Sequence, residues 1–470
     1  MERRDFLRTL GIGAAAIGCG SILSAGCAKR KKPNIVFILA DDQGWTGLSE
    51  RMDPGVEGSY SDYYQTPNLD RLAQSGMRFT RGYAPAPVCS PTRHSIQFGK
   101  NPANLGVTHN NPRYRQHCDP RFAMANLIKK ANPEYTTAHL GKWHVSFSPD
   151  ACGYDVSDGR TNNREGDTST DPEDPKRVLD LTRRAIAFME EQGEAGRPFF
   201  IQISHYADHL KFKSSPGSRA KYENLPRGEK HRDSVFAGMN EDLDRGVGMI
   251  LDALDDLGIA EETYVIYMAD NGFDENRQPA PVRRELKAWP LSYSKGYIWE
   301  GGIRVPFLVR GPGIVSGTVC RTPVVGYDVL PTVLSIVNPD YEIPEDIEGG
   351  TLLPLCLRNG NGEIDRPNDF LVFHYPMGGW PTQSAIMKGE YKLIKTWAFD
   401  RLELFNLRED ISEMKDLSKS LPEKTEELHR DLMDYLKRVD AVMPPEVELE
   451  IDREEPLMKL YHTRNWKSKN

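Results

Sequence analysis

Three apolar runs that each end abruptly in polar residues constrain the fold of this chain most strongly. They are NIVFILADDQG (34–44), PFFIQISHYADH (198–209) and TYVIYMADNG (263–272). Each is an unbroken series of aliphatic and aromatic residues, which is the pattern of a strand buried on both faces. Segments of helical pattern, including 177–192 and 235–257, alternate with them. We therefore expect an α/β fold with a large, mixed but mostly parallel sheet sandwiched by helices.

Acidic and amide side chains stand at the ends of these strands, at Asp41, Asp42, Asp270 and Asn271. In open parallel sheets, ligands bind beyond the carboxyl ends of the strands. Carboxylates crowded together repel one another unless a cation lies between them. An all-oxygen ligand set favours Ca²⁺ or Mg²⁺ over zinc. These four residues therefore predict a divalent metal site.

Basic and titratable side chains gather at comparable positions. They follow the expected strand YTTAHL in GKWH, lie in SHYADH, and occur in the glycine-rich stretch YSKGYIWEGGIRVP. Taken singly, each is more simply explained as a surface lysine or a hydrogen-bonded core histidine. Together with an arginine at position 93 they predict an anion pocket that faces the metal. The residues are Arg93, Lys142, His144, His205, His209 and Lys295.

A single cysteine, Cys89, stands among prolines in YAPAPVCSPTRHS (83–95). Pro85, Pro87 and Pro91 exclude a regular strand or helix interior there. A helix over 92–98 would place Cys89 near a helix N-terminus, where backbone N–H groups favour negative charge. The position therefore suits chemistry better than packing. The other mature cysteines are widely and irregularly spaced, which fits neither a disulfide framework nor a zinc pattern and leaves their pairing open.

The first 27 residues have the features of an export signal. Arg3 and Arg4 precede a short apolar stretch rich in glycine and alanine, which resembles a twin-arginine leader. Cys27 follows LSAG, as at a lipoprotein cleavage site, and whether it carries a lipid stays open. We expect an exported protein, in the periplasm or at the outer surface. The net charge of −8 excludes a broad basic face, so no nucleic-acid partner is expected.

Two further segments differ from the rest of the chain in their amino-acid composition and pattern. Residues 158–177 contain no aliphatic or aromatic side chain, which favours a solvated surface loop, with a substrate-contacting rim as the alternative. After about residue 365, DFLVFHYP, SAIMKGEYKLIKTW and RLELFNL are typical of short strands, and a charged helix is expected near 421–439. We expect a catalytic domain over 33–365 and a smaller α+β subdomain with an antiparallel sheet over 366–470.

The stretch CSPTR (89–93) resembles the Cys-x-Pro-x-Arg signature of type I sulfatases, in the alkaline phosphatase-like superfamily. In that family the cysteine is oxidised to formylglycine before the enzyme works. PNIVFILADDQG, TPNLDRLAQSGMRFTRGYA, GKWH, MADNG, KGYIWEGGIRVP and MKGEYKLI follow the family's order and approximate spacing. The resemblance implies hydrolysis of sulfate monoesters, is nearest to bacterial carbohydrate sulfatases, and implies a formylglycine-generating or anaerobic sulfatase-maturing enzyme as a partner in biosynthesis.

The resemblance also implies a role for each candidate residue. The metal, most simply Ca²⁺ with Mg²⁺ as the alternative, would be held by four strand-end residues and the modified cysteine side chain. The metal ligands would be Asp41, Asp42, Asp270, Asn271 and the modified Cys89. Arg93, Lys142 and His144 would hold the formylglycine hydrate and the sulfate oxygens. Lys295 would contact the sulfate and the ester oxygen, and His209 would protonate the leaving alcohol.

One departure from the family pattern leaves the general acid open. His209 is followed by Leu-Lys where the family has x-Pro, so His205, four residues earlier, is the alternative acid and a candidate substrate contact. Two rival functions remain at this stage. One is a phosphomonoesterase or phosphonate hydrolase on the same fold, and the other is a non-catalytic binder of sulfated glycans whose Cys89 is never oxidised.

Overall fold

A computed structural model describes residues 32–109, 117–274, 288–376 and 381–454 of the chain. The expected leader, with Cys27, lies outside the described residues. Within the described ranges, no helix is long and apolar enough to cross a membrane.

An eight-stranded sheet forms the centre of the larger part of the molecule, with the strand order β5-β4-β6-β1-β7-β8-β2-β9. β1 pairs in parallel with β6 on one side and with β7 on the other. Only β8 runs against its neighbours, β7 and β2. The strands are β1 (Asn34–Ala40), β2 (Met77–Phe79), β4 (Thr136–Gly141), β5 (Val156–Ser157), β6 (Phe199–Ser204), β7 (Thr263–Ala269), β8 (Phe307–Arg310) and β9 (Thr318–Cys320).

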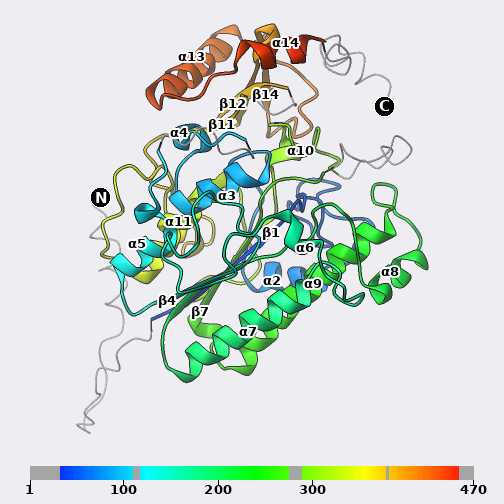
Figure 1. The fold of residues 1–470 in the computed structure, drawn as a ribbon. Helices are drawn as coiled ribbons and strands as arrows, with labels where there is room; N and C mark the ends of the chain where they lie inside the picture. Colours follow the sequence, from blue (N-terminus) through cyan, green and yellow to red (C-terminus); the bar gives the residue numbers. More distant parts are fainter. Residues whose placement is uncertain (1–31, 110–116, 275–287, 377–380, 455–470) are drawn as a thin grey trace, which may run out of the picture.

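Helices cover both faces of this sheet, as Figure 1 shows. One layer contains α2 (Pro67–Ser75), α7 (Val178–Glu194) and α9 (Ser234–Asp256), and the other contains α3 (Cys89–Phe98), α5 (Met124–Ala131) and α11 (Val329–Val337). All seven side chains of β1 are buried between the layers, which explains why its sequence is apolar without alternation.

Several shorter elements lie between the main helices and strands. The helices are α4 (Pro102–Leu105), α6 (Asn163–Gly166), α8 (Pro216–Glu223), α10 (Glu300–Ile303) and α12 (Leu353–Cys356). β3 (Gly82–Tyr83) pairs with β10 (Val324–Val325). The 3-10 turns are η2 (Pro120–Phe122), η3 (Ala260–Glu262), η4 (Gly326–Asp328) and η5 (Trp397–Phe399).

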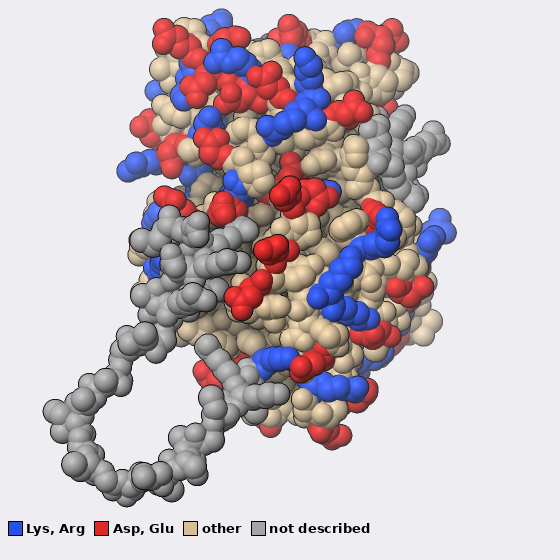
Figure 2. Space-filling view, turned by 90° about the vertical axis from the view of Figure 1, so that its left-hand side faces the viewer, with Lys and Arg blue, Asp and Glu red and all other residues tan. Residues whose placement is uncertain are grey.

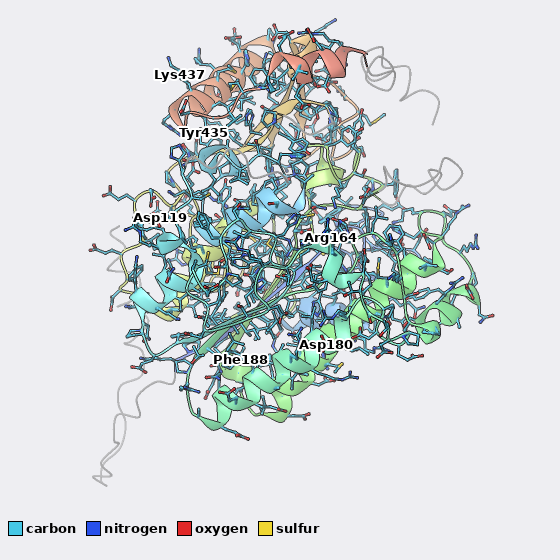
Figure 3. All side chains as sticks on the ribbon, viewed as in Figure 1. Asp119, Arg164, Asp180, Phe188, Tyr435 and Lys437 are labelled. Carbon is cyan, nitrogen blue, oxygen red and sulfur yellow. The ribbon has the colours of Figure 1, made fainter. Side chains whose placement is uncertain are left out.

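A second sheet of four antiparallel strands follows in the C-terminal part, in the simple order β11-β12-β13-β14. One face of it packs against α13, which begins at Pro422 as the sequence predicts, and α14 follows. Figure 3 shows Tyr435 on the side of α13 toward the large sheet and Lys437 on the other side. The elements are β11 (Leu371–Tyr375), β12 (Gln383–Lys388), β13 (Tyr391–Thr396), β14 (Arg401–Asn406), α13 (Pro422–Arg438) and α14 (Glu446–Glu454).

The expected fold class is therefore confirmed: a mixed, mostly parallel sheet between helices, with an antiparallel sheet near the C-terminus. On the face shown in Figure 2, acidic and basic side chains are interspersed, without a large region of one sign.

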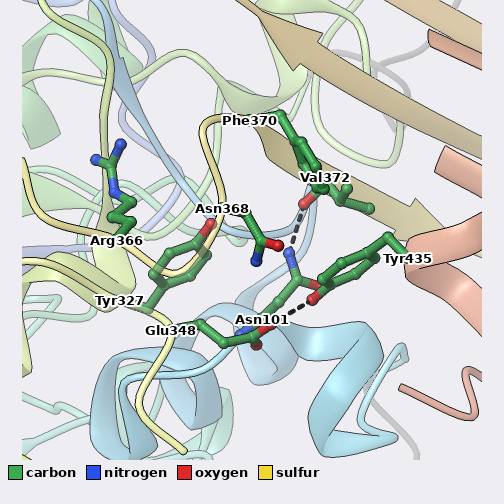
Figure 4. Close-up of a pocket in the computed structure, with 8 residues that line it drawn as sticks. All are labelled: Asn101, Tyr327, Glu348, Arg366, Asn368, Phe370, Val372 and Tyr435. Atoms are coloured by element: carbon green, nitrogen blue, oxygen red, sulfur yellow. Dashed lines mark hydrogen bonds between the residues drawn. The ribbon is translucent and has the colours of Figure 1, made fainter. Parts of the chain in front are cut away.

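Contacts of two kinds, polar and apolar, join the C-terminal part to the larger part. In a small polar pocket, the Tyr435 hydroxyl donates to Glu348 Oε1 at 2.8 Å and Asn101 Nδ2 donates to the Val372 carbonyl at 2.6 Å (Figure 4). Apolar side chains from both parts form one buried cluster that includes Tyr83, Trp299, Phe373 and Ile394.

Candidate active site

The polar residues that follow β1 and β7 lie side by side. Ala40 and Ala269 are partners in the parallel ladder, so Asp41-Asp42 and Asp270-Asn271 leave the sheet at the same edge. The Asp42 N–H donates to Asp270 Oδ1 at 3.1 Å, and Asn271 Nδ2 donates to Asp42 Oδ1 at 2.7 Å. All four side chains are buried. The structure thus brings these four residues together at one edge of the sheet.

Cys89 lies beside these acids, and it comes from a helix and not from a strand end. It is the first residue of α3, and it is 1% exposed. One ligand atom from each of Asp41, Asp42, Asp270 and Cys89 lies within 4.8 Å of the others. Burial raises the pKa of the Cys89 thiol to about 12, although Lys142 and Lys295 oppose this effect. An unmodified thiol here would therefore stay protonated at neutral pH and would be a poor nucleophile.

Arg93 lies one turn further along α3 and reaches the same acids. Its Nε donates to Asp270 Oδ2 at 2.8 Å, and its Nη1 donates to the Lys142 carbonyl at 2.5 Å. Burial alone would lower the pKa of this guanidinium, but Asp270 and Asp41 raise it. Arg93 is thus a permanently charged group that ties the end of β7 to the segment after β4.

Lys142 and His144 come from that segment. Lys142 Nζ lies 2.5 Å from Asp41 Oδ2, and both side chains are fully buried. His144 has a left-handed backbone with φ of 53°. Burial, with the charges of Lys142 and Arg93, lowers the pKa of His144 to about 2, so this imidazole is neutral. Among the described residues its Nδ1 has no hydrogen-bond partner, which leaves that nitrogen available to an incoming group.

Lys295 completes the ring of cations. Its Nζ lies 2.6 and 2.7 Å from the two carboxylate oxygens of Asp42. Burial would lower the pKa of this amine, but the Asp42 carboxylate raises it well above the usual value. The Lys295 amide donates to the Phe273 carbonyl at 2.9 Å, so its backbone is fixed to the segment that carries Asp270 and Asn271.

The structure separates the two candidate acids. His209 Nε2 lies 3.9 Å from Asp42 Oδ2, and the side chain is 13% exposed. His209 Nδ1 lies 2.5 Å from the Leu210 carbonyl, an acceptor, so Nδ1 carries the proton and Nε2 faces the acids with a lone pair. His205 lies elsewhere: it is fully buried and pairs with Thr182 of α7 at 3.3 Å. The structure therefore brings His209, and not His205, to the site.

Residues of the polar segment 158–177 form part of the wall of this site. The Thr161 hydroxyl accepts from the Trp143 amide at 2.8 Å, and the Thr161 carbonyl accepts from the His144 amide at 2.9 Å. Asn163 Nδ2 lies 3.1 Å from His209 Nε2. The favoured expectation of a purely solvated loop was wrong for these residues. Their polar composition could not distinguish side chains that face water from side chains that face a polar site.

The donor set fits a divalent cation. Asp41 Oδ1 and Asn271 Oδ1 are buried, and neither has a hydrogen-bond partner within the described part of the chain. Buried acceptors of this kind are costly unless a ligand satisfies them. Hard oxygen donors of this number are typical ligands of Ca²⁺ and Mg²⁺. Each of the three carboxylates also pairs with a buried cationic side chain: Asp270 with Arg93, Asp41 with Lys142 and Asp42 with Lys295.

The fold and this arrangement of acids, cations and Cys89 define a member of the alkaline phosphatase-like class. Residues 33–339 match the family model described as Sulfatase, and residues 290–441 match the model described as N-sulphoglucosamine sulphohydrolase, C-terminal. The chain belongs to the sulfatase family. The expected enzyme class, a sulfuric ester hydrolase, is confirmed.

Curated relatives match over most of their length. Arylsulfatase G of Rattus norvegicus is 26% identical, and the match covers 89% of this chain and 88% of the relative. N-acetylgalactosamine-6-sulfatase of Mus musculus is 29% identical, with 80% and 74% covered. The ulvan-active sulfatase of Formosa agariphila is 28% identical, with 78% and 73% covered.

Solved structures show the same fold. Ps i-CgsB, in complex with k-i-k-neocarrahexaose, has a TM-score of 0.73 at 24% identity and covers 92% of this chain and 99% of its own. The phosphonate monoester hydrolase of Silicibacter pomeroyi has a TM-score of 0.66 at 17% identity and covers 87% and 96%. The alkaline phosphatase-like fold that the sequence predicts is thereby confirmed.

Proposed function

We propose that this protein removes sulfate from sulfated carbohydrates, with a formylglycine formed from Cys89 and one divalent cation, Ca²⁺ with Mg²⁺ as the alternative. The observation that carries the proposal is the convergence of Cys89 with Asp41, Asp42 and Asp270, within 4.8 Å. The place of Cys89 among metal-type ligands suits a precursor whose product coordinates the cation.

When present, the formylglycine would supply a hydrate hydroxyl that attacks sulfur and a second hydroxyl whose deprotonation expels sulfate, and the cation would polarise both. The acids Asp41, Asp42 and Asp270, with the Asn271 amide oxygen, would hold that cation. Once a cation balances the carboxylates, the charges of Arg93, Lys142 and Lys295 become available to an anionic substrate. The oxidised side chain of Cys89 would be the fifth ligand of the cation, as the family resemblance implies.

His144 and His209 would handle the protons. His144 is neutral and offers an unpartnered nitrogen, which suits a base that removes a proton from the hydrate. His209 presents Nε2 at the partly open side of the site, and in its doubly protonated form it would deliver the Nε2 proton to the leaving alkoxide while Nδ1–H stays bonded to the Leu210 carbonyl. The enclosed position of His205 with Thr182 favours His209 as this acid, and it argues against His205 as a substrate contact.

The names of relatives support a carbohydrate substrate, and the leader supports a location outside the cytoplasm. Relatives include an ulvan-active sulfatase and N-acetylgalactosamine-6-sulfatase, whose names refer to sulfated sugars. The leader at 1–27 has the pattern of an export signal, and Cys27 would provide the lipid anchor of a surface protein. We infer export to the periplasm or outer surface, after oxidation of Cys89 by a maturing enzyme.

Two measurements test this function. The first is mass spectrometry of the peptide that contains residue 89, from protein made in its native host, where we expect the aldehyde in place of the thiol. The second is sulfate release from a panel of 2-, 3-, 4- and 6-sulfated monosaccharides and oligosaccharides. Cys89→Ala is the matched control and is expected to be inactive. An unmodified thiol in host-derived protein would refute the hydrolase and favour a glycan-binding role.

A phosphonate or phosphate monoesterase is the second candidate, because a phosphonate monoester hydrolase shares the fold with a TM-score of 0.66. The same protein assayed with phosphate and phosphonate monoesters separates the two. The sulfatase proposal expects kcat/KM for the best sulfate ester to exceed that for the phosphorus ester. The reverse order would favour the second candidate.

A further inference from the structure

The loop that carries Lys295, residues 292–301, is anchored first to the active site itself. The Lys295 amide donates to the Phe273 carbonyl, and the Gly296 amide donates to the Pro87 carbonyl, both at 2.9 Å. Phe273 follows Asn271 by two residues, and Pro87 precedes Cys89 by two. We call residues 292–301 the Lys295 loop. These two hydrogen bonds fix the central part of the loop to the segment after the strand-end acids and to the segment before α3.

The two ends of the Lys295 loop are held by the C-terminal part of the chain. The Ser292 hydroxyl donates to the Ser412 carbonyl at 2.5 Å, and the Glu300 amide donates to Glu413 Oε2 at 2.9 Å. The Gly301 amide donates to the Ser292 carbonyl at 2.8 Å, which closes the base of the loop. Two consecutive residues after β14 therefore hold both ends of the loop.

A buried ionic cluster reinforces this anchor. Lys392 Nζ, from β13, lies 2.8 Å from Glu300 Oε1 and 2.8 Å from Glu413 Oε1, and all three side chains are fully buried. The Tyr83 hydroxyl donates to Glu300 Oε2 at 2.9 Å, and Arg304 Nη1 lies 3.3 Å from the same oxygen. We call these five residues the Glu300 cluster.

Stability alone does not account for the Glu300 cluster. Buried ion pairs can often be replaced by apolar residues at no cost in folding free energy, because desolvation offsets their attraction. Charged hydrogen bonds do, however, fix geometry more narrowly than apolar contacts do. The backbone at the end of the loop is closely packed. A Cβ on Gly301 would lie 2.0 Å from the Tyr293 carbonyl oxygen, and a Cβ on Gly302 would lie 2.0 Å from the Tyr297 carbonyl oxygen. A displacement at Glu300 would therefore pass along the loop.

We propose that Lys392 and Glu413 are positioning residues for the active site, which hold the Lys295 loop so that Lys295 reaches the sulfate group. This inference rests on the proposed function, in which Lys295 contacts the substrate. Neither residue touches a candidate site side chain among the contacts described, so each acts through the loop. The C-terminal sheet then contributes to catalysis as well as to folding.

The pocket in Figure 4 offers a matched control. Tyr435 also links the C-terminal part to the larger part, by a partly buried hydrogen bond of 2.8 Å to Glu348, which lies in the segment before α12 and not in the Lys295 loop. Tyr435→Phe removes that bond while leaving the ring. It should lower stability without changing kcat/KM by more than about twofold.

A double-mutant cycle tests the proposal, with kcat/KM for sulfate release from the best sulfated sugar as the readout. We expect Glu413→Ala to lower kcat/KM roughly 10- to 100-fold, because a small misplacement of a charged group is costly. Lys295→Ala should lower it at least about 100-fold. In the Lys295→Ala background, Glu413→Ala should then have less than about a twofold further effect. Glu413→Gln can accept from the Glu300 amide or from Lys392 but not from both, so its kcat/KM should fall between those of Glu413→Ala and the parent.

Multiplying effects in the double variant would overturn the proposal, because a purely structural residue acts independently of Lys295. So would a Glu413→Ala variant with normal kcat/KM. Thermal unfolding of each variant shows that it is folded, and Lys392→Met replaces Glu413→Ala in the cycle if the latter does not fold. If Lys295→Ala alone is fully active, the assigned role of Lys295 fails instead, which is a separate result.

Discussion

Asp42 and Asp270 are joined by a hydrogen bond from the backbone of one to the side chain of the other, at 3.1 Å. The two residues end neighbouring strands that are distant in sequence, so the sheet, and not a local turn, sets the spacing of their carboxylates. The geometry of each acid thus depends on the other.

Asp270→Asn tests the charge at this position while retaining an acceptor for the Asp42 amide. We expect sulfate release to fall at least about 100-fold, because the cation loses a ligand and Arg93 loses its partner. Elemental analysis should show less than one bound ion per chain, and circular dichroism should show an intact fold. Normal metal content together with normal turnover would contradict the assignment.

Removal of the metal is a second test. Dialysis against a chelator should abolish sulfate release and lower the unfolding temperature. A cation at a free concentration of 100 times its Kd stabilises the native state by about 2.7 kcal/mol, and the chelator removes this contribution. Addition of Ca²⁺ should restore both properties, and Mg²⁺ is the comparison. A chelated protein that is metal-free by elemental analysis and still fully active would exclude a catalytic cation.

The two histidines near the end of β6 should behave differently. His209→Ala is expected to lower kcat for a sulfated sugar about 100- to 10,000-fold, the usual range for a lost general acid. An aryl sulfate with an acidic leaving group needs no proton and should lose much less. His205→Leu is the matched control and should keep its turnover. If His205→Leu is the variant with the strong leaving-group dependence, the assignment is reversed.

The site should also be sensitive to substitution of Gly272. A Cβ there would lie 1.9 Å from the Gly301 carbonyl oxygen, so Gly272→Ala must displace either Asn271 or the Lys295 loop. We expect a loss of at least about 10-fold in kcat/KM from this displacement. Gly193→Ala, in α7 with nothing within 4 Å of the added Cβ, is the control and should raise stability by roughly 0.5–1 kcal/mol. Equal behaviour of the two variants would argue against this account.

Buried histidines predict acid sensitivity. Burial lowers the pKa of His374 to about 4, from an ordinary value of 6.5, and His374 lies between Ser384 and the Val442 carbonyl. Because the unfolded chain takes up a proton first, the free energy of unfolding should fall as pH drops from about 6.5 to about 4, by up to about 3 kcal/mol for this group. Denaturant unfolding between pH 7 and pH 4.5 measures this slope. His374→Gln should show a shallower slope than the parent, and an unchanged slope would assign the sensitivity to other groups.

Much of the fold and site could be predicted because the signals are local. The strand of β1 and the acids after it are contiguous, so the run of apolar residues and its abrupt end placed Asp41 and Asp42 at the edge of the sheet. The same reasoning placed Asp270 and Asn271. A fold with parallel strands then required the two pairs to meet.

Other features depend on contacts that no local pattern contains. His205 and His209 are four residues apart after one strand, and only the path of the chain decides that one faces Thr182 and the other Asp42. Lys392 reads as an ordinary strand residue, since its partner Glu300 lies 92 positions away. The division of the chain at residue 365 stays a prediction, and the grip of Glu413 on the Lys295 loop shows how closely the two parts are joined.

The order of strands in the large sheet bears on how such a protein is made. β1 has no neighbours in the sheet until β6 and β7 emerge from the ribosome, and Arg93 of α3 lacks the Asp270 carboxylate until the end of β7 emerges. Under the proposed maturation, the cysteine that ends 1% exposed stays open to an oxidising enzyme throughout that interval. Oxidation of Cys89 then competes with its burial by folding. Slower translation should therefore raise the yield of active protein. Overproduction beyond the capacity of the oxidising enzyme should leave chains that are folded but inactive.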